Sequence, residues 1–371
     1  MSEWKEYTIG EICSRFSSGK SIKASQISDE GLYPVYGGNG LRGFTDTFNF
    51  DGECSIIGRQ GAYCGNVRYF KGKAFMTEHA IVAVVNENHN NGYVSNLLSM
   101  MNLAQYQGQS AQPGLSVSTL SKITIKLPDL ATQEECFNVL NLIDQKIQIN
   151  NQINQELEAM AKTLYDYWFV QFDFPDQNGK PYKSSGGKMV YNPELKREIP
   201  EGWGVARLDQ LQIATGKRDA NFETEHGKYD FWTTANSPIK ADEFSFEGKA
   251  ILIAGNGNFY VNFTDGKFEA YQRTYVIQSE DEKMLIFMYM ACLQSAEKLR
   301  KGSNGSIIKY ITIGDVNNIS SPYDHNVVDE FVKIYSPLID QISKNKNQNQ
   351  ELTQLRDWLL PMLMNGQVKV E

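Results

Sequence analysis

The sequence predicts an α+β protein made of two mixed α/β domains in a pseudo-twofold tandem repeat, separated by two long antiparallel coiled-coil helices. Three observations predict this fold class: a long amphipathic segment in mid-chain, a second copy of it at the C-terminus, and matching anchor residues between them. A length of 371 residues favours two or three domains. The expected division is 1–130 (first domain), 131–174 (central helix), 175–202 (linker), 203–326 (second domain) and 327–371 (C-terminal helix).

The segment from Thr132 to about Gln171 is predicted to form the central helix. Its apolar residues alternate three and four positions apart, which is typical of a coiled-coil seam. They are Val139, Ile143, Ile153, Leu157, Met160, Leu164 and Tyr167. Thr132 and Glu135 have the spacing of a capping box, which predicts the start of the helix. The rise of about 1.5 Å per residue gives a rod on the order of 58 Å long.

The C-terminal segment repeats the central helix. Leu142–Gln145 recurs as Leu338–Gln341, 196 residues later, and Asn154–Leu157 recurs as Asn349–Leu352, 195 residues later. Two such blocks in two long helices indicate a tandem duplication.

The second helix is expected from about Val327 to Asn365, with Pro337 disturbing its first turns and Gly366 ending it. Asn150 and Asn345 take equivalent positions on the two seams. A polar seam residue usually fixes register and pairing at some cost in stability, and we favour that role over a ligand.

The two globular segments share anchors and differ in their loops. In the first, strands are predicted at Leu32–Tyr36, Ser55–Ile57, Asn66–Phe70, Ala80–Val85 and Lys122–Leu127, and a helix at Tyr93–Leu103. In the second, the counterparts are Trp203 for Trp4, Leu211 for Ile12, Tyr229 for Tyr33, Phe246–Gly248 for Phe50–Gly52, Gly266-Lys267 for Gly72-Lys73, and a helix at Leu285–Leu293. A repeated scaffold with unlike loops fits two readers of different targets.

Composition excludes several classes of protein. No run approaches 18 apolar residues, so no membrane span is expected, and the acidic N-terminus lacks the apolar core of a signal peptide. Five cysteines without a CxxC pattern indicate reduced thiols in a cytoplasm, and four scattered histidines show no zinc spacing. The net charge is −8, and residues 131–174 carry much of it. An acidic helix favours a protein partner, so any DNA surface must be a local basic patch.

No catalytic signature stands out. Gly38–Gly43 matches GxGxxG, but the aromatic segment after it is not helical, so a flexible loop that approaches a ligand is favoured over a dinucleotide site. The chain has no Asn/Asp-Pro-Pro-aromatic or Pro-Cys methyltransferase motif, no nuclease cluster and no nucleophile elbow.

Basic and amide residues gather instead in glycine-rich loops. Arg and Asn/Gln can read bases and Lys can hold phosphates, although for any single residue a solvated surface role is the alternative. The candidate DNA-binding residues are Asn39, Arg42, Arg59, Gln60, Lys71, Lys73 and Gln112 in the first domain and Lys217, Arg218, Asn236, Asn256, Asn258, Lys267, Arg273 and Asn304 in the second. Arg68 and Lys240 belong to the same groups.

Four motifs in order resemble the specificity subunit of Type I restriction–modification systems. Tyr165–Pro175 resembles the end of the family's central helix, and Pro200–Trp203 resembles the opening of its second target-recognition domain. Leu355–Val368 resembles its C-terminal signature, and Leu-Ile-Asp-Gln occurs in both helices. The match covers essentially the whole chain.

The resemblance implies a non-catalytic subunit with two target-recognition domains that read a bipartite, asymmetric double-stranded DNA sequence, and helices that set the spacing. Two modification subunits and the restriction subunits would dock on it in the cytoplasm, as part of phage defence. S-adenosylmethionine, ATP and Mg would be bound by those partners, with none in this chain. A fused modification or cleavage enzyme and a coiled-coil adaptor without DNA are the alternatives.

Overall fold

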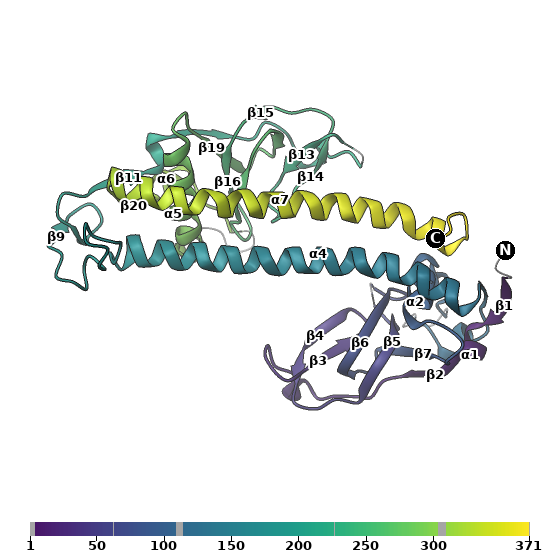
Figure 1. The fold of residues 1–371 in the computed structure, drawn as a ribbon. Coiled ribbons are helices and arrows are strands. Elements are labelled where there is room, and N and C mark those ends of the chain that lie inside the picture. The colour runs from purple at the N-terminus through teal and green to yellow at the C-terminus, as the bar shows by residue number, and fades with distance from the viewer. Residues whose placement is uncertain (1–3, 62, 109–113, 226, 303–308, 371) are drawn as a thin grey trace. The chain divides into compact units, whose positions relative to one another are not determined.

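The structure is a computed structural model that describes residues 4–61, 63–108, 114–225, 227–302 and 309–370 (Figure 1). It divides into two compact units, one of residues 1–149 with 348–371 and the other of residues 150–347. Each unit holds one β-rich domain together with one end of each long helix. The predicted α+β class and the two long helices are therefore confirmed.

The long helices are α4 (Leu130–Tyr165), which continues into the π-helical turn η3 (Asp166–Val170), and α7 (His325–Met364). The capping box predicted at Thr132 is wrong. Asp129 caps α4 instead, since its Oδ1 accepts a hydrogen bond from the Thr132 amide at 3.0 Å. Asp324 caps α7 in the same way, accepting from the Val327 amide at 3.1 Å.

Pro337 does not interrupt α7, contrary to our expectation, because the helix runs unbroken from His325. The missing amide hydrogen removes one helical hydrogen bond, and the buried side chains of Tyr335 and Ile339 on either side of the proline hold the helix in place.

The buried stripe of α4 keeps the predicted alternation of three and four residues with other members. It comprises Gln133, Cys136, Leu140 and Ile143 in the first unit and Asn150, Asn154, Ala161 and Tyr165 in the second, and it continues to Trp168 of η3. Ile153, Met160 and Tyr167 were wrongly predicted on the seam, because they are 40%, 58% and 39% exposed. Several of the buried positions carry amide or small side chains. The apolar pattern of the sequence therefore indicated the neighbouring stripe of the helix.

The two helices are antiparallel within each unit. In the first unit Arg356 donates to Asp144 at 2.9 Å, and Leu363 shares a core with Cys136. In the second unit Asn345 Nδ2 donates to Asn154 Oδ1 at 2.8 Å. The rings of Phe331 and Tyr165 lie 6.0 Å apart.

The β domain of the first unit is a six-stranded sheet of order β2-β7-β5-β6-β3-β4. The strands are β2 (Cys13–Ser18), β3 (Tyr33–Gly37), β4 (Gly40–Thr45), β5 (Phe50–Gly58), β6 (Val67–Met76) and β7 (Ala80–Val85). A separate pair joins β1 (Lys5–Thr8) to β8 (Thr124–Leu127), and the helical segments are α1 (Ile9–Ile12), η1 (Ala24–Gln26), α2 (Asn91–Met100), η2 (Leu103–Tyr106) and α3 (Val117–Leu120). The glycine-rich Gly38–Gly43 segment forms the turn and start of the β3–β4 hairpin, so no helix follows it.

The domain of the second unit has two four-stranded sheets, β12-β19-β16-β17 and β14-β13-β18-β15, and the pair β11-β20. Its strands are β11 (Gly204–Arg207), β12 (Gln212–Thr215), β13 (Tyr229–Trp232), β14 (Ile239–Ala241), β15 (Phe246–Glu247), β16 (Ala250–Ala254), β17 (Val261–Thr264), β18 (Lys267–Ala270), β19 (Thr274–Gln278) and β20 (Ser320–Tyr323). Its helical segments are η4 (Leu208–Gln210), η5 (Ala220–Phe222), α5 (Glu282–Gly302) and α6 (Ile313–Asn317).

Hydrogen-bond register matches the two domains strand by strand. Gly52 and Gly72 face each other on β5 and β6, and Gly248 donates to the carbonyl of Gly266 at the matching place. In the first unit β5 and β6 continue through this glycine pair, whereas in the second unit each strand divides there into two. The duplication inferred from sequence is therefore visible in the backbone.

The segment 175–202, expected as a linker, contains the hairpin β9 (Met189–Asn192) and β10 (Arg197–Pro200). Ile199 is buried in the core of the second unit, and Tyr182 stacks on Phe174 with ring centroids 4.8 Å apart. This segment is thus packed against its unit. Across the described ranges, no helix is long and apolar enough to cross a membrane.

Candidate nucleic-acid interface

One place in each domain combines an identical backbone arrangement with exposed polar side chains. In the first domain the ends of β2 and β5 flank the start of β7. Gly19 donates to the Ala80 carbonyl at 3.0 Å, and Arg59 donates to the His79 carbonyl at 3.0 Å. Lys20, Gln60 and His79 project from this position, which we call the strand-end site.

The second domain repeats the strand-end site bond for bond. Gly216 donates to the Thr274 carbonyl at 2.9 Å, and Gly255 donates to the Arg273 carbonyl at 2.7 Å. Lys217, Asn256 and Arg273 therefore occupy the positions of Lys20, Gln60 and His79.

The segment after the long loop closes the site in the same manner in both domains. Leu115 donates to the Arg59 carbonyl at 2.9 Å, and Ile311 donates to the Gly255 carbonyl at 3.0 Å. Isolated bridges pair Gln60 with Gly114 and Asn256 with Tyr310. The candidates Gln112 and Asn304 precede these bridges in the chain and lie outside the described residues.

Glycine is required beside each lysine of the site because the strands approach closely. A Cβ on Gly19 would lie 2.1 Å from the Met76 carbonyl oxygen, and one on Gly216 would lie 2.1 Å from the Tyr271 carbonyl oxygen. The Gly-Lys pair at 19–20 and 216–217 is therefore a structural constraint with an exposed cation attached. Sequence reasoning found Lys217 and missed Lys20 and His79, although the repeated dipeptide was a usable signal.

Several candidates are already engaged by neighbouring groups. Arg59 donates to the Leu115 carbonyl at 3.2 Å and to Ser18 at 3.4 Å. Lys71 pairs with Glu53 at 2.8 Å. Arg218 pairs with Glu243 at 2.6 Å, contacts the buried Glu269 and lies over the Phe222 ring. Lys240, from the same group, pairs with Asp230 at 2.7 Å.

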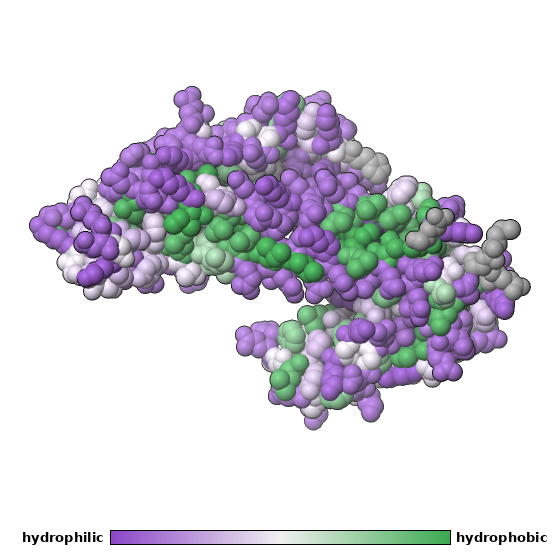
Figure 2. All heavy atoms as spheres, in the orientation of Figure 1, coloured by the Kyte–Doolittle hydropathy of each residue, from purple (hydrophilic) through white to green (hydrophobic). Residues whose placement is uncertain are grey.

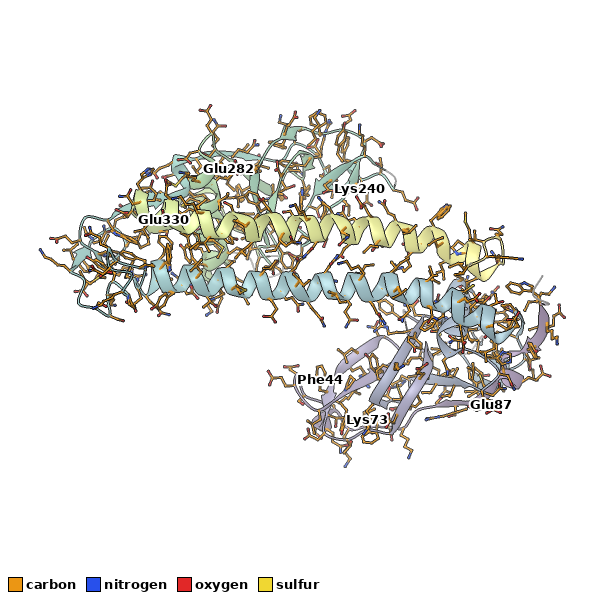
Figure 3. The ribbon with its side chains drawn as sticks, viewed as in Figure 1. Phe44, Lys73, Glu87, Lys240, Glu282 and Glu330 are labelled. Carbon is orange, nitrogen blue, oxygen red and sulfur yellow. The ribbon has the colours of Figure 1, made fainter. Side chains whose placement is uncertain are left out.

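Lys73 and Lys267 belong to the repeated scaffold. Lys73 lies 4.9 Å from the centre of the Phe48 ring, which packs on Tyr33 at 5.0 Å (Lys73 is labelled in Figure 3). Lys267 lies 4.7 Å from the Phe244 ring, which packs on Tyr229 at 4.9 Å. Because both domains keep this cluster, these two lysines are poorly suited to distinguish one sequence from another.

The remaining candidates lie in turns or on exposed strands. Asn39 is exposed in the β3–β4 turn, and Arg42 is exposed on β4. Asn236 is exposed in the loop between β13 and β14. Asn258 donates to the Tyr260 hydroxyl at 3.2 Å. No contact with DNA tests these residues, so they stay predictions.

A polar hollow adjoins the β3–β4 turn. In the first domain it measures about 290 Å³ and is lined by Tyr36, Asn39, Asn66 and Arg68 among others. Burial raises the pKa of Tyr36, and the positive charge of Arg68 opposes that shift, so the Tyr36 hydroxyl stays a neutral donor and acceptor.

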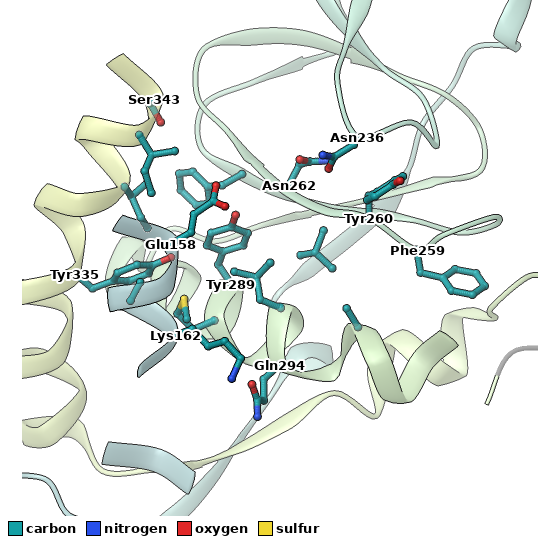
Figure 4. A pocket seen from close by; sticks show the side chains of 18 of the residues that line it. Glu158, Lys162, Asn236, Phe259, Tyr260, Asn262, Tyr289, Gln294, Tyr335 and Ser343 are labelled. Carbon is teal, nitrogen blue, oxygen red and sulfur yellow. The ribbon is translucent and has the colours of Figure 1, made fainter. Parts of the chain in front are cut away.

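The second domain has a larger hollow of about 410 Å³ (Figure 4). Asn262, which takes the register position of Arg68, lines it together with Asn236 and Tyr260. Residues of α4, α5 and α7, such as Glu158, Gln294 and Ser343, form the opposite wall. The two domains therefore present unlike polar groups at equivalent places.

Groups suited to metal binding do not cluster among the described residues, where no three His, Cys, Asp or Glu side chains come together. The five cysteines are unpaired, and burial raises the pKa of the Cys54 thiol to about 12, so that thiol stays protonated.

Fold and site together define a tandem-repeat protein with two similar β domains whose exposed polar side chains differ. The family model of the Type I restriction modification DNA specificity domain matches residues 1–159 and 200–354. The chain belongs to this family.

Individual relatives of the chain are also specificity subunits of Type I restriction enzymes. The chain is 40% identical over 164 residues to the Type I restriction enzyme EcoprrI specificity subunit of Escherichia coli, covering 43% of this chain and 41% of that protein. It is 29% identical over 297 residues to the MjaIX specificity subunit of Methanocaldococcus jannaschii, covering 72% and 66%. The alignments thus span about two fifths and about two thirds of these relatives.

A crystal structure of the Type I restriction–modification S subunit from M. genitalium has a similar fold. Its TM-score is 0.67 at 16% sequence identity, and the match covers 98% of this chain and 96% of that chain.

Proposed function

We propose that this chain is the DNA specificity subunit of a Type I restriction–modification complex, in which each β domain reads one half of a bipartite, asymmetric double-stranded target. The observation that carries the proposal is that each family-matched segment, 1–159 and 200–354, spans one β domain and most of the long helix that follows it. Equivalent backbone positions with unlike polar side chains suit two unlike half-sites.

The long helices suit protein partners. In the second unit, Ile153 and Met160 of α4 and Tyr167 of the following turn η3 form an exposed apolar stripe, and Figure 2 shows apolar side chains along this helix. The segment 131–174, which contains this stripe, carries a net negative charge. We assign this face to the docking of two modification subunits, to which the restriction subunits are added.

The chemistry then belongs to the partners. S-adenosylmethionine for adenine methylation, and ATP and Mg for restriction, are bound by the modification and restriction subunits, while this chain directs them and does not catalyse. The complex acts in the cytoplasm, where host DNA is methylated and unmethylated phage DNA is cut. The long helices act as a spacer between the two readers.

Genome-wide methylation mapping tests the proposal. In the host strain, deletion of this chain should abolish methylation at one bipartite adenine motif, and re-expression should restore it. Expression of a chain truncated before Pro200, which keeps only the first repeat, controls for protein supply and should not restore the two-part motif. Retention of every methylated motif in the deletion strain would contradict the proposal.

A further inference from the structure

The strand-end site separates a constant residue from variable ones. Lys20 and Lys217 are the same residue at matching positions, and their amides donate to the Met76 and Ala270 carbonyls at 2.9 and 3.0 Å. Gln60 and His79 in the first domain are replaced by Asn256 and Arg273 in the second. Identical backbone with partly different side chains is the arrangement expected of a reading position on a duplicated scaffold.

These side chains are available to a ligand. Lys20, Gln60, His79, Lys217 and Arg273 are exposed, and Asn256 is half-buried. Within the described ranges, no hydrogen bond or ion pair engages the side chains of Lys20, Asn256 or Arg273. Gln60 Oε1 contacts His79 Nδ1 at 3.2 Å, which places that amide and imidazole together. His79 Nε2 also lies 3.6 Å from Glu78 Oε1, whereas Arg218 and Lys71 hold carboxylates at the shorter distances of 2.6 and 2.8 Å.

We propose that Gln60 with His79 reads bases in one half-site, that Asn256 with Arg273 reads bases in the other, and that Lys20 and Lys217 hold the adjacent phosphates. This assignment rests on the proposed function. Asn and Gln amides match adenine in the major groove, and Arg matches guanine. A lysine next to a glycine that the close strands require supplies a point charge that carries no sequence information, which explains why both repeats keep it.

Exchange of the reading pairs tests the assignment. The variant Gln60→Asn with His79→Arg gives the first domain the pair of the second, and Asn256→Gln with Arg273→His does the reverse. Each variant is expressed with its modification subunits in the deletion strain, and methylation is mapped. We expect each exchange to alter base preference in one half-site by roughly ten- to a hundredfold and to leave the other half-site unchanged.

The matched control makes the same chemical changes elsewhere. Gln105→Asn with His325→Arg alters an exposed amide and an exposed imidazole away from the strand-end sites, and should keep both half-sites. If an exchange abolishes methylation, the single variants Gln60→Asn and Asn256→Gln are mapped by the same criterion. Retention of both original half-sites by the exchanged or single variants overturns the assignment. Absence of any bipartite motif in the wild-type strain contradicts the proposed function instead.

Substitution of Lys20 or Lys217 should change the salt dependence of DNA binding and leave the base preference unchanged. Lys20→Ala and Lys217→Ala should each weaken binding of the purified complex to its target and to unrelated duplex alike, and lower the slope of log affinity against log salt by about 1. Lys126→Ala, which removes an exposed lysine paired with Glu6 at 3.3 Å, should leave that slope unchanged. If a lysine variant changed the methylated motif and kept the wild-type salt slope, the proposal that these lysines bind phosphates would be wrong.

Discussion

The two β domains differ at one pair of parallel strands, which is β3 with β6 in the first domain and β13 with β18 in the second. Hydrogen-bond register places Glu269 at the position of Phe75. Glu269 is fully buried, accepts from Ser245 at 2.7 Å and contacts Arg218 at 3.4 Å. One copy of the duplicated sheet thus carries an aromatic ring where the other carries a compensated charge.

This difference shows which basic residues serve the fold. Arg218 offsets a buried carboxylate in the second domain, whereas the first domain has Phe75 in place of that carboxylate. A basic residue beside a strand end can therefore serve a buried carboxylate that only one of the two repeats contains. The shared lysines and the scaffold clusters around Phe48 and Phe244, in contrast, occur in both repeats.

Loss of Arg218 should have the largest effect. Arg218→Met leaves the Glu269 carboxylate buried without its cation and should lower the stability of the second unit by roughly 2–3 kcal/mol, less than for a fully buried pair because Arg218 is partly exposed. Urea unfolding followed by hydrogen exchange in each unit measures it. Arg218→Met with Glu269→Met should recover most of the loss, since the uncompensated charge is gone.

Lys301→Met, whose partner Glu297 is also exposed, is the control and should leave stability near the wild-type value. If Arg218→Met altered a methylated half-site while stability stayed at the wild-type value, Arg218 would be a reader, as its sequence context suggested.

The sequence predicted the parts of the molecule that depend on local pattern. Ala80–Val85 is an uninterrupted apolar run, and β7 has those bounds. The long helices and the duplication followed from periodicity and repeated blocks. The coiled-coil seam did not, because Asn154 is buried beside Asn345 of α7 and Ala161 is buried in the core of the second unit, contacts that periodicity does not show. The roles of basic side chains also escaped prediction, since ion pairs such as Lys71–Glu53 and Arg218–Glu269 depend on strand register.

The matching glycines Gly72 and Gly266 should show a smaller loss of stability on substitution, and a similar one in the two domains. Gly72 and Gly266 have φ of 127° and 103°, although β6 continues through one and the strand breaks at the other. A Cβ would meet no atom closer than 3.8 Å at either position, so the cost of alanine is backbone strain. Gly72→Ala and Gly266→Ala should each cost about 1 kcal/mol in urea unfolding.

Gly204→Ala is the matched control, because it lies in strand β11 with no atom nearer than 4.0 Å and no left-handed φ. Its stability should stay near the wild-type value. A large difference between Gly72→Ala and Gly266→Ala would show that only one repeat needs the bend, and that the broken strands of the second domain have another cause.

His89 should give the smallest effect, confined to the first unit. It lies beside the Tyr7 ring at 5.1 Å and the Gln133 amide at 3.3 Å, and burial lowers its pKa. The unfolded chain therefore takes up the proton at a higher pH than the folded chain. The stability contribution is fully present above the unfolded pKa of about 6.5 and is lost as pH falls through that value toward the folded pKa.

Hydrogen exchange at α2, compared between pH 7.5 and 5.5, should show this loss of stability, and His89→Phe should remove the pH dependence. Because no histidine occupies the corresponding segment Gln278–Asp281, the same comparison at α5 isolates the His89 contribution. A pH dependence that persists in His89→Phe would assign the sensitivity to other groups of the first unit.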